Sequence, residues 1–129
     1  MSKRKSIILL ALIIVILIGG VCMIIIQNKP PNVKTFELND YQYYIDCFPF
    51  EENVGNVIDA KDVIKKAENV WISLYGESVK KEKPYQVFYD KKNGVWLVRG
   101  SLRSNIKGGV ANILIQNETG NIIAVWHDK

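Results

Sequence analysis

The sequence has few of the residues on which hydrolytic, redox and metal chemistry depend. Its 129 residues include one histidine, His127, and two cysteines, Cys22 and Cys47. A Ser/His/Asp or Cys/His site needs a histidine that a neighbour fixes, and His127 is two residues from the end of the sequence. One histidine and one cysteine beyond the apolar N-terminal run make no recognisable metal-ligand spacing. The paired acids Glu51 and Glu52 fit a solvated loop better than an acid–base pair. We therefore predict that the protein is not an enzyme and uses no cofactor or metal.

Charged residues are absent from residues 7–26, IILLALIIVILIGGVCMIII. A helix rises about 1.5 Å per residue, so these twenty residues span roughly the 30 Å hydrocarbon core of a bilayer. Lys3, Arg4 and Lys5 precede the run, and the positive-inside rule then keeps the N-terminus in the cytoplasm. We predict a cytoplasmic stub and single-pass anchor in the cell membrane over residues 1–26, with the C-terminal domain outside the cytoplasm. The anchor residues include Ile7, Leu10, Ile14, Leu17 and Ile26.

A cysteine inside this run introduces the alternative of a lipid anchor. Lipoproteins typically carry leucine at the third position before the modified cysteine and a small residue immediately before it. Here those positions hold Gly19 and Val21, and apolar residues continue beyond Cys22. Because Val21 is bulky and β-branched, we favour an uncleaved helix over lipidation at Cys22. A cleaved secretory signal is a third alternative.

The rest of the chain carries little net charge. Fourteen of the 17 Lys and Arg residues and all 13 acids lie in residues 27–129, which gives this part a net charge of +1. That balance excludes the basic footprint of a nucleic-acid-binding protein. Because this part contains only Cys47, it has no intramolecular disulfide and depends on an ordinary hydrophobic core, in which we expect Cys47 to be buried.

Between the apolar run and the domain we expect a short spacer. Residues 27–34, QNKPPNVK, are polar and contain two adjacent prolines, which favour an extended backbone. The domain is then expected over residues 35–129. Its first part, residues 35–50, is rich in aromatic residues without a clean period, and we expect one or two short strands there. Residues 51–56 indicate a loop.

An amphipathic helix of about four turns is predicted from Asp59 to Tyr75. The Asp59 carboxylate can accept the unpaired N–H groups of the first turn, and Gly76 supplies the left-handed residue that ends many helices. The apolar positions recur at helical spacing and form one stripe, which must cover another element. They are Val63, Ile64, Ala67, Val70, Trp71 and Leu74.

A sheet provides that element. Two predicted hairpins turn at Asn93-Gly94 and at residues 117–120, and their four strands cover residues 84–90, 95–102, 109–116 and 121–127. The expected fold class is α+β, with one main helix packed on a curved, mainly antiparallel sheet. In the first strand Val87 points to one face and Phe88 to the other, so we expect the second face to be partly covered.

Two further stretches allow a functional interpretation beside an ordinary one. The basic run of residues 79–84 fits a solvated loop, and a contact with an acidic partner or with anionic lipid headgroups is the alternative. Tyr41, Tyr43 and Tyr44 fit either a binding surface or the edge of the core, because tyrosine gives contact area at low entropic cost.

A series of short motifs runs in order through residues 55–128. A helix containing Trp71 ends in LYGE, and KPY, GVWLV and GGVA follow before a final glycine and histidine. In this order the motifs resemble the bacterial immunity proteins with a nuclear-transport-factor-2-like (cystatin-like) fold. The motif residues, which we expect to be mostly structural, are Trp71, Tyr75, Gly76, Pro84, Tyr85, Trp96, Gly100, Gly108, Gly109 and His127.

Members of that family are thought to protect a cell by binding a toxin that neighbouring cells deliver, without catalysis. The resemblance therefore implies an immunity protein whose partner is a cognate protein toxin, and the apolar run of residues 7–26 adds the membrane anchor. The alternative is an exported PepSY-like module that restrains a peptidase or acts in envelope sensing, because such modules also join a helix to a hairpin and a strand near Thr119-Gly120. A small-molecule binder or enzyme is a third class, against which the shortage of histidine and clustered acids argues.

Overall fold

The computed structural model describes residues 29–103 and 107–129. The predicted anchor residues Ile7, Leu10, Ile14, Leu17 and Ile26 lie outside this part of the chain, as does Cys22. Within the described ranges, no helix combines the length and apolar character that a bilayer crossing requires. Residues 31–129 form one of two units of the chain, and the fold described below is that of this second unit.

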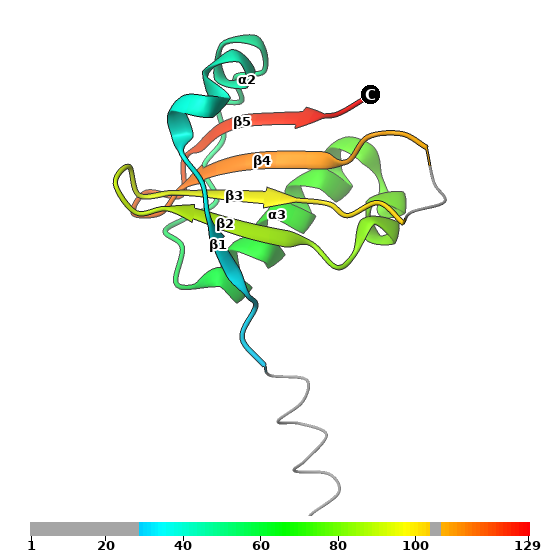
Figure 1. The fold of residues 1–129 in the computed structure, drawn as a ribbon, viewed down its shortest axis with the longest axis horizontal. Helices are drawn as coiled ribbons and strands as arrows, with labels where there is room; N and C mark the ends of the chain where they lie inside the picture. Colours follow the sequence, from blue (N-terminus) through cyan, green and yellow to red (C-terminus); the bar gives the residue numbers. More distant parts are fainter. Residues whose placement is uncertain (1–28, 104–106) are drawn as a thin grey trace, which may run out of the picture. The chain divides into compact units, whose positions relative to one another are not determined.

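The second unit is an α+β domain built on a five-stranded sheet (Figure 1). The strands are β1 (Val33–Thr35), β2 (Gln86–Asp90), β3 (Val95–Arg99), β4 (Ala111–Gln116) and β5 (Ile122–His127), and they lie side by side in this order. Strands β2 to β5 pair antiparallel, whereas β1 pairs parallel to β2. The predicted helix on a mainly antiparallel sheet is confirmed. The sheet also includes β1, which begins at Val33 within the predicted spacer.

Helix α3 (Ala60–Tyr75) begins and ends where its caps were predicted. The Asp62 N–H donates to Asp59 Oδ1 at 2.8 Å, and Gly76 ends the helix with φ 85°. The predicted stripe is buried or half-buried from Val63 as far as Trp71, and Trp71 has no exposed surface. Leu74 is 44% exposed, although it lies on the same stripe. The prediction that Leu74 is buried is therefore wrong, because the stripe extends beyond the residues that cover it.

Two hydrophobic cores lie on the two faces of the sheet. The first core, against α3, joins Trp71 and Val63 to sheet residues such as Val87. The second core lies on the opposite face and includes Leu97 and Trp126. It is covered by the 3₁₀ helix η1 (Leu38–Tyr41) and the short helix α2 (Gln42–Cys47). The predicted opposite orientation of Val87 and Phe88 is confirmed, since these residues belong to different cores.

The strands predicted within residues 35–50 were wrong, because this segment is mainly helical. Leu38, Tyr41 and Ile45 recur at intervals of three and four, and their side chains pack on the second core. The many aromatic residues, which favour strands in general, misled the prediction. Cys47 is exposed and not buried as predicted, since it lies in the part of α2 that does not contact the core.

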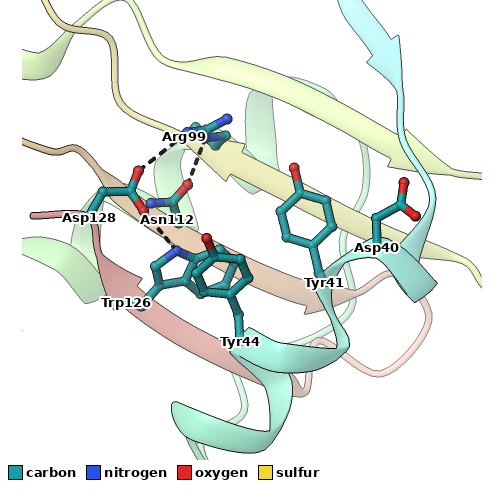
Figure 2. Close-up of a pocket in the computed structure, with 7 residues that line it drawn as sticks. All are labelled: Asp40, Tyr41, Tyr44, Arg99, Asn112, Trp126 and Asp128. Carbon is teal, nitrogen blue, oxygen red and sulfur yellow. Dashed lines mark hydrogen bonds and ion pairs between the residues drawn. The ribbon is translucent and has the colours of Figure 1, made fainter.

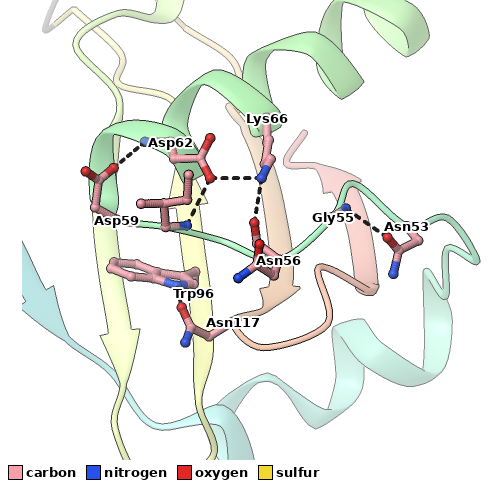
Figure 3. A network of polar contacts seen from close by, with 9 residues as sticks. Asn53, Gly55, Asn56, Asp59, Asp62, Lys66, Trp96 and Asn117 are labelled. Atoms are coloured by element: carbon pink, nitrogen blue, oxygen red, sulfur yellow. Dashed lines mark hydrogen bonds and ion pairs between the residues drawn. The ribbon is translucent and has the colours of Figure 1, made fainter.

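A loop follows α2 and crosses the sheet edge before α3 begins (Figure 3). The Ile122 N–H donates to the Glu52 carbonyl at 2.8 Å, and the Val57 N–H donates to the Asn117 carbonyl at 2.9 Å. Near the N-terminal end of α3, Lys66 Nζ contacts both the Asn56 carbonyl, at 2.7 Å, and an Asp62 carboxylate oxygen, at 2.8 Å. These bonds join the predicted loop of residues 51–56 to the β4–β5 turn and to the first turns of α3.

The basic run of residues 79–84 is not the simple loop that was predicted. Glu77–Glu82 form the 3₁₀ helix η2, in which Val79 is buried in the first core. The two strands predicted from residues 84 and 109 begin at Gln86 and Ala111. Lys83 and Pro84, between η2 and β2, are exposed.

Candidate functional site

An open pocket of about 280 Å³ lies where η1 and α2 face the ends of β3, β4 and β5 (Figure 2). One wall of the pocket is aromatic and the other is a polar network on the sheet. Its lining residues are Asp40, Tyr41, Tyr44, Arg99, Asn112, Trp126 and Asp128.

The polar wall consists of side chains that bind one another. Arg99 Nε donates to Asn112 Oδ1 at 2.7 Å, and its Nη2 lies 3.3 Å from Asp128 Oδ2. Trp126 Nε1 donates to the other Asp128 oxygen at 3.2 Å. Asn112 is 1% exposed and stands opposite Arg99 in the pairing of β3 with β4. The network therefore forms a fixed wall and leaves neither carboxylate oxygen of Asp128 without a donor.

The aromatic wall is supplied by η1 and α2. Tyr44 stacks on Trp126 with ring centroids 4.5 Å apart and an interplanar angle of 16°, and the Tyr41 ring lies 6.1 Å from Trp126. Figure 2 shows the hydroxyl groups of Tyr41 and Tyr44 beside the pocket, with Asp40 at its rim. The pocket thus offers aromatic surface, phenolic hydroxyls and a carboxylate, which suit binding.

The three tyrosines of this segment take different positions. Tyr41 and Tyr44 pack against the second core and form the core edge that was one of the two predicted alternatives. Tyr43 points the other way and is 68% exposed, with its ring 5.4 Å from that of Tyr44. The other alternative, a binding surface, therefore has one candidate aromatic side chain on α2 itself.

Glu82, the last residue of η2, ties the ends of three strands together. Its carboxylate accepts the Ala111 N–H at 2.7 Å, and its carbonyl accepts the Ser101 N–H at 2.7 Å. A carboxylate oxygen also lies 3.6 Å from His127 Nε2. Gly100 packs directly against the Glu82 side chain, which leaves no room for a Cβ at that position. This glycine therefore allows Glu82 to reach the strand ends.

The motif residues lie either in the first core or around Glu82. Trp71, Tyr85 and Trp96 belong to the core, where the Trp71 and Tyr85 rings form a T-shaped pair at 5.2 Å. His127 is T-shaped to Tyr75 at 5.5 Å, so the end of β5 is held against the end of α3. The remaining motif residues end α3 or line the turns beside Glu82; they are Gly76, Pro84, Gly100, Gly108 and Gly109.

One further polar cluster stabilises the domain beside the first core. Tyr85 Oη donates to Glu68 at 2.7 Å, and Lys83 Nζ lies 2.9 Å from the same carboxylate oxygen. Partial burial acts to raise the pKa of Glu68, but the hydrogen bonds from Tyr85 and Lys83 outweigh it and lower the pKa. Burial and the bond to Glu68 raise the pKa of the Tyr85 phenol. Within the described residues, no group of three or more His, Cys, Asp or Glu side chains is placed to hold a metal ion.

The family model described as NTF2 fold immunity protein matches residues 63–129, just over half of the chain. The chain belongs to this family. No curated protein and no solved structure matches it. The predicted resemblance over residues 55–128 is confirmed by a match that covers most of α3, η2 and the four antiparallel strands.

The polar residues that could not be identified from the sequence lie mostly outside the family motifs. Asn112 lies inside the apolar strand β4, and Asp90 is the last residue of β2. Both are buried polar residues that hydrogen-bond to other segments of the chain. Glu82 was interpreted as part of a solvated run. The sequence around Glu82 gives no indication that its carboxylate binds the strand ends. The one available signal is Gly100, because a glycine at the end of a strand can indicate that another segment packs closely against it. The helical segment η1–α2 precedes the residues that match the family.

Proposed function

We propose that this protein is a membrane-anchored immunity protein that neutralises a cognate protein toxin by binding it, without catalysis. The observation that carries the proposal is the family match over residues 63–129. Binding without chemistry is supported by the polar groups at the pocket and around Glu82, which hydrogen-bond to one another and to the backbone. The anchor is supported by the uncharged run of residues 7–26 and the preceding Lys3-Arg4-Lys5.

An exported, tethered inhibitor suits a toxin that acts at or outside the membrane. A protein fixed to the membrane surface meets such a toxin before the toxin reaches its target. The domain then acts by occlusion: when it binds the toxin, it covers the surface through which the toxin works. The cost of this mechanism is one immunity protein for each toxin bound.

Co-expression with the product of the neighbouring reading frame tests the proposal. We expect the full-length chain to restore growth to cells in which that product is toxic, and to co-purify with it from detergent-solubilised membranes. A matched control carries the same chain with Trp71→Ala, which removes the largest fully buried side chain of the core. Toxicity that persists in the presence of the folded wild-type chain contradicts the proposal. Inhibition of a peptidase by the wild-type chain would instead favour a PepSY-like role.

A further inference from the structure

The outer side of α2 is an exposed aromatic surface on a rigid support. Tyr43, Asp46 and Cys47 share one side of the helix through their spacing of three and four, and Phe48 follows directly. Tyr43 is 68% exposed and Phe48 is 42% exposed. The Cys47 side chain lies close enough to Tyr43 to raise the pKa of the phenol. We name these four residues the α2 face.

The other side of α2 fixes this face in place. Tyr44 and Ile45 pack on the second core, and Tyr44 stacks on the buried Trp126 at 4.5 Å. The Val125 N–H also donates to the Phe48 carbonyl at 3.2 Å. Aromatic side chains that are already held in position give contact area at low entropic cost, which is why they are frequent at protein interfaces. The α2 face is therefore preorganised for contact with another molecule.

Charge decides what kind of molecule fits this face. Residues 35–60 contain six acids and neither Lys nor Arg, whereas residues 61–129 contain twelve Lys and Arg and seven acids. Five ion pairs lie within residues 61–129. Asp46 within the α2 face and the acids that flank the face in the sequence are all exposed, and none takes part in those pairs; the flanking acids are Glu37, Asp40, Glu51 and Glu52. The Lys34 ammonium lies over the second core, above the Phe88 ring, but these acids outnumber it, and such an acidic border attracts a basic surface and repels anionic lipid.

The pocket continues this surface toward the sheet. Asp40, Tyr41 and Tyr44 line the pocket from the same two short helices that carry the α2 face. A side chain of a partner docked on α2 can enter this hollow at its rim, where the Tyr41 ring and the Asp40 carboxylate suit a lysine or arginine, whereas Arg99 lines the sheet side of the pocket. Contact surface and hollow together give a bound partner both area and orientation.

We infer that the α2 face, with its acidic border, is the surface that docks the toxin, and that the toxin presents a basic, partly apolar surface to it. The inference rests on the proposed function. Segment η1–α2 lies outside residues 63–129, which match the family. The family scaffold thus carries a contact surface that is supplied by a separate part of the chain, and that part sets which toxin is bound.

Substitutions on the α2 face test the inference, with matched controls on α3 and η2. We expect Tyr43→Ala and Asp46→Lys in the full-length chain each to weaken binding of the neighbouring gene's product by at least about tenfold. Leu74→Ala also truncates a large exposed side chain, 44% exposed against 68% for Tyr43, and Glu77→Lys makes the same charge reversal on η2. We expect both controls to bind within about threefold of wild type. Equal unfolding midpoints show that the variants are folded.

The possible outcomes distinguish an incorrect docking surface from an incorrect proposed function. Loss of binding and of growth rescue in Tyr43→Ala and Asp46→Lys alone supports the inference. If the toxin binds wild type and these two variants equally, the α2 face is not the docking surface, and the proposed function stands. If Asp46→Lys disrupts self-association of the chain and leaves toxin binding intact, the face belongs to a second copy and the inference is overturned. If wild type does not bind or protect at all, the proposed function fails, and the inference with it.

Discussion

Buried polar side chains hold together segments of this domain that are far apart in the sequence. Asp90, which is 5% exposed, accepts hydrogen bonds from the Leu38 N–H at 2.8 Å and from Asn93. It thereby joins the β2–β3 turn to the start of η1. Asn112 joins β4 to the pocket through Arg99. Removing one partner of such a buried bond costs about 1–3 kcal/mol, so single residues control how η1 and the pocket are placed.

Acid lability is predicted from these carboxylates. Hydrogen bonds from the Asn93 side chain and from the Leu38 and Asn93 N–H groups lower the pKa of Asp90. Burial opposes a lowered pKa for Asp62, but bonds from Lys66 and the Ile58 N–H outweigh it. The folded state therefore binds fewer protons than the unfolded state around the ordinary carboxyl pKa of about 4. Its stability is complete above that pH and falls as the pH drops toward the lowered values.

Thermal unfolding measured from pH 7 to pH 2 checks this prediction. We expect Asp90→Asn to be less stable at pH 7 and to lose less stability on acidification, since one titrating group is gone. A wild-type melting temperature that stays constant or rises between pH 5 and pH 3 would contradict the prediction. An undiminished acid dependence in Asp90→Asn would show that this carboxylate does not contribute.

Truncation of the core tryptophan is the largest single-residue effect that we expect. Trp71 has no exposed surface, and its ring contacts Tyr85. Trp71→Ala should lower the free energy of unfolding by about 3–5 kcal/mol, because it leaves a cavity beneath α3. Denaturant titration followed by circular dichroism measures the change. Leu74→Ala, on the same helix and 44% exposed, should cost less than about 1 kcal/mol; equal costs would show that α3 is not packed as described.

Among the elements, those with strong local signals could be predicted from the sequence. Asp59 and Gly76 mark the two ends of α3, and the turn at Asn93-Gly94 marks the hairpin between β2 and β3. The short helix α2 could not be predicted, since one and a half turns hold too few residues to show a period. It forms because tertiary packing of Tyr44 and Ile45 on the second core outweighs their preference for strands.

The candidate site was less predictable than the fold. Its aromatic wall comes from η1–α2 and its polar wall from β3, β4 and the end of β5. Only the register of the strands brings Arg99 opposite Asn112, and neither residue belongs to a motif. The tyrosines were correctly singled out, but the two alternatives for them could be separated only by seeing which side of α2 meets the sheet.

The β4–β5 turn provides a test of close packing between elements. Gly120 has φ 74° and lies directly against the backbone of Gly55, whereas Gly76 has φ 85° and open space around it. Gly76→Ala should cost about 1–3 kcal/mol, because φ 85° with ψ 179° is a backbone conformation that essentially only glycine adopts. Gly120→Ala should cost about 1–3 kcal/mol more, because the new Cβ also displaces the loop. Denaturant unfolding of the two variants gives the difference, and equal losses would refute the close approach.

On the scale of the whole molecule, we predict that the N-terminal segment determines where the domain acts. The run of residues 7–26 predicts a retained helix, and Val21 disfavours processing before Cys22. Intact mass spectrometry of the membrane-extracted protein should therefore show residues 1–26 still attached. A mass that begins at a diacylated Cys22 would replace the helix with a lipid anchor, and a shorter unmodified chain would indicate cleavage of a secretory signal.

The parallel pairing of β1 with β2 has a mechanical consequence. Chain tension from the N-terminal side enters the domain at β1, whose residues Val33, Lys34 and Thr35 stand in register with β2. When force runs along a strand, the hydrogen bonds across it are strained together in shear and do not break one after another. A pull on the rest of the sheet against the N-terminal connection would therefore load the β1–β2 pairing in shear, and we expect β1 to stay paired with β2 under such a load.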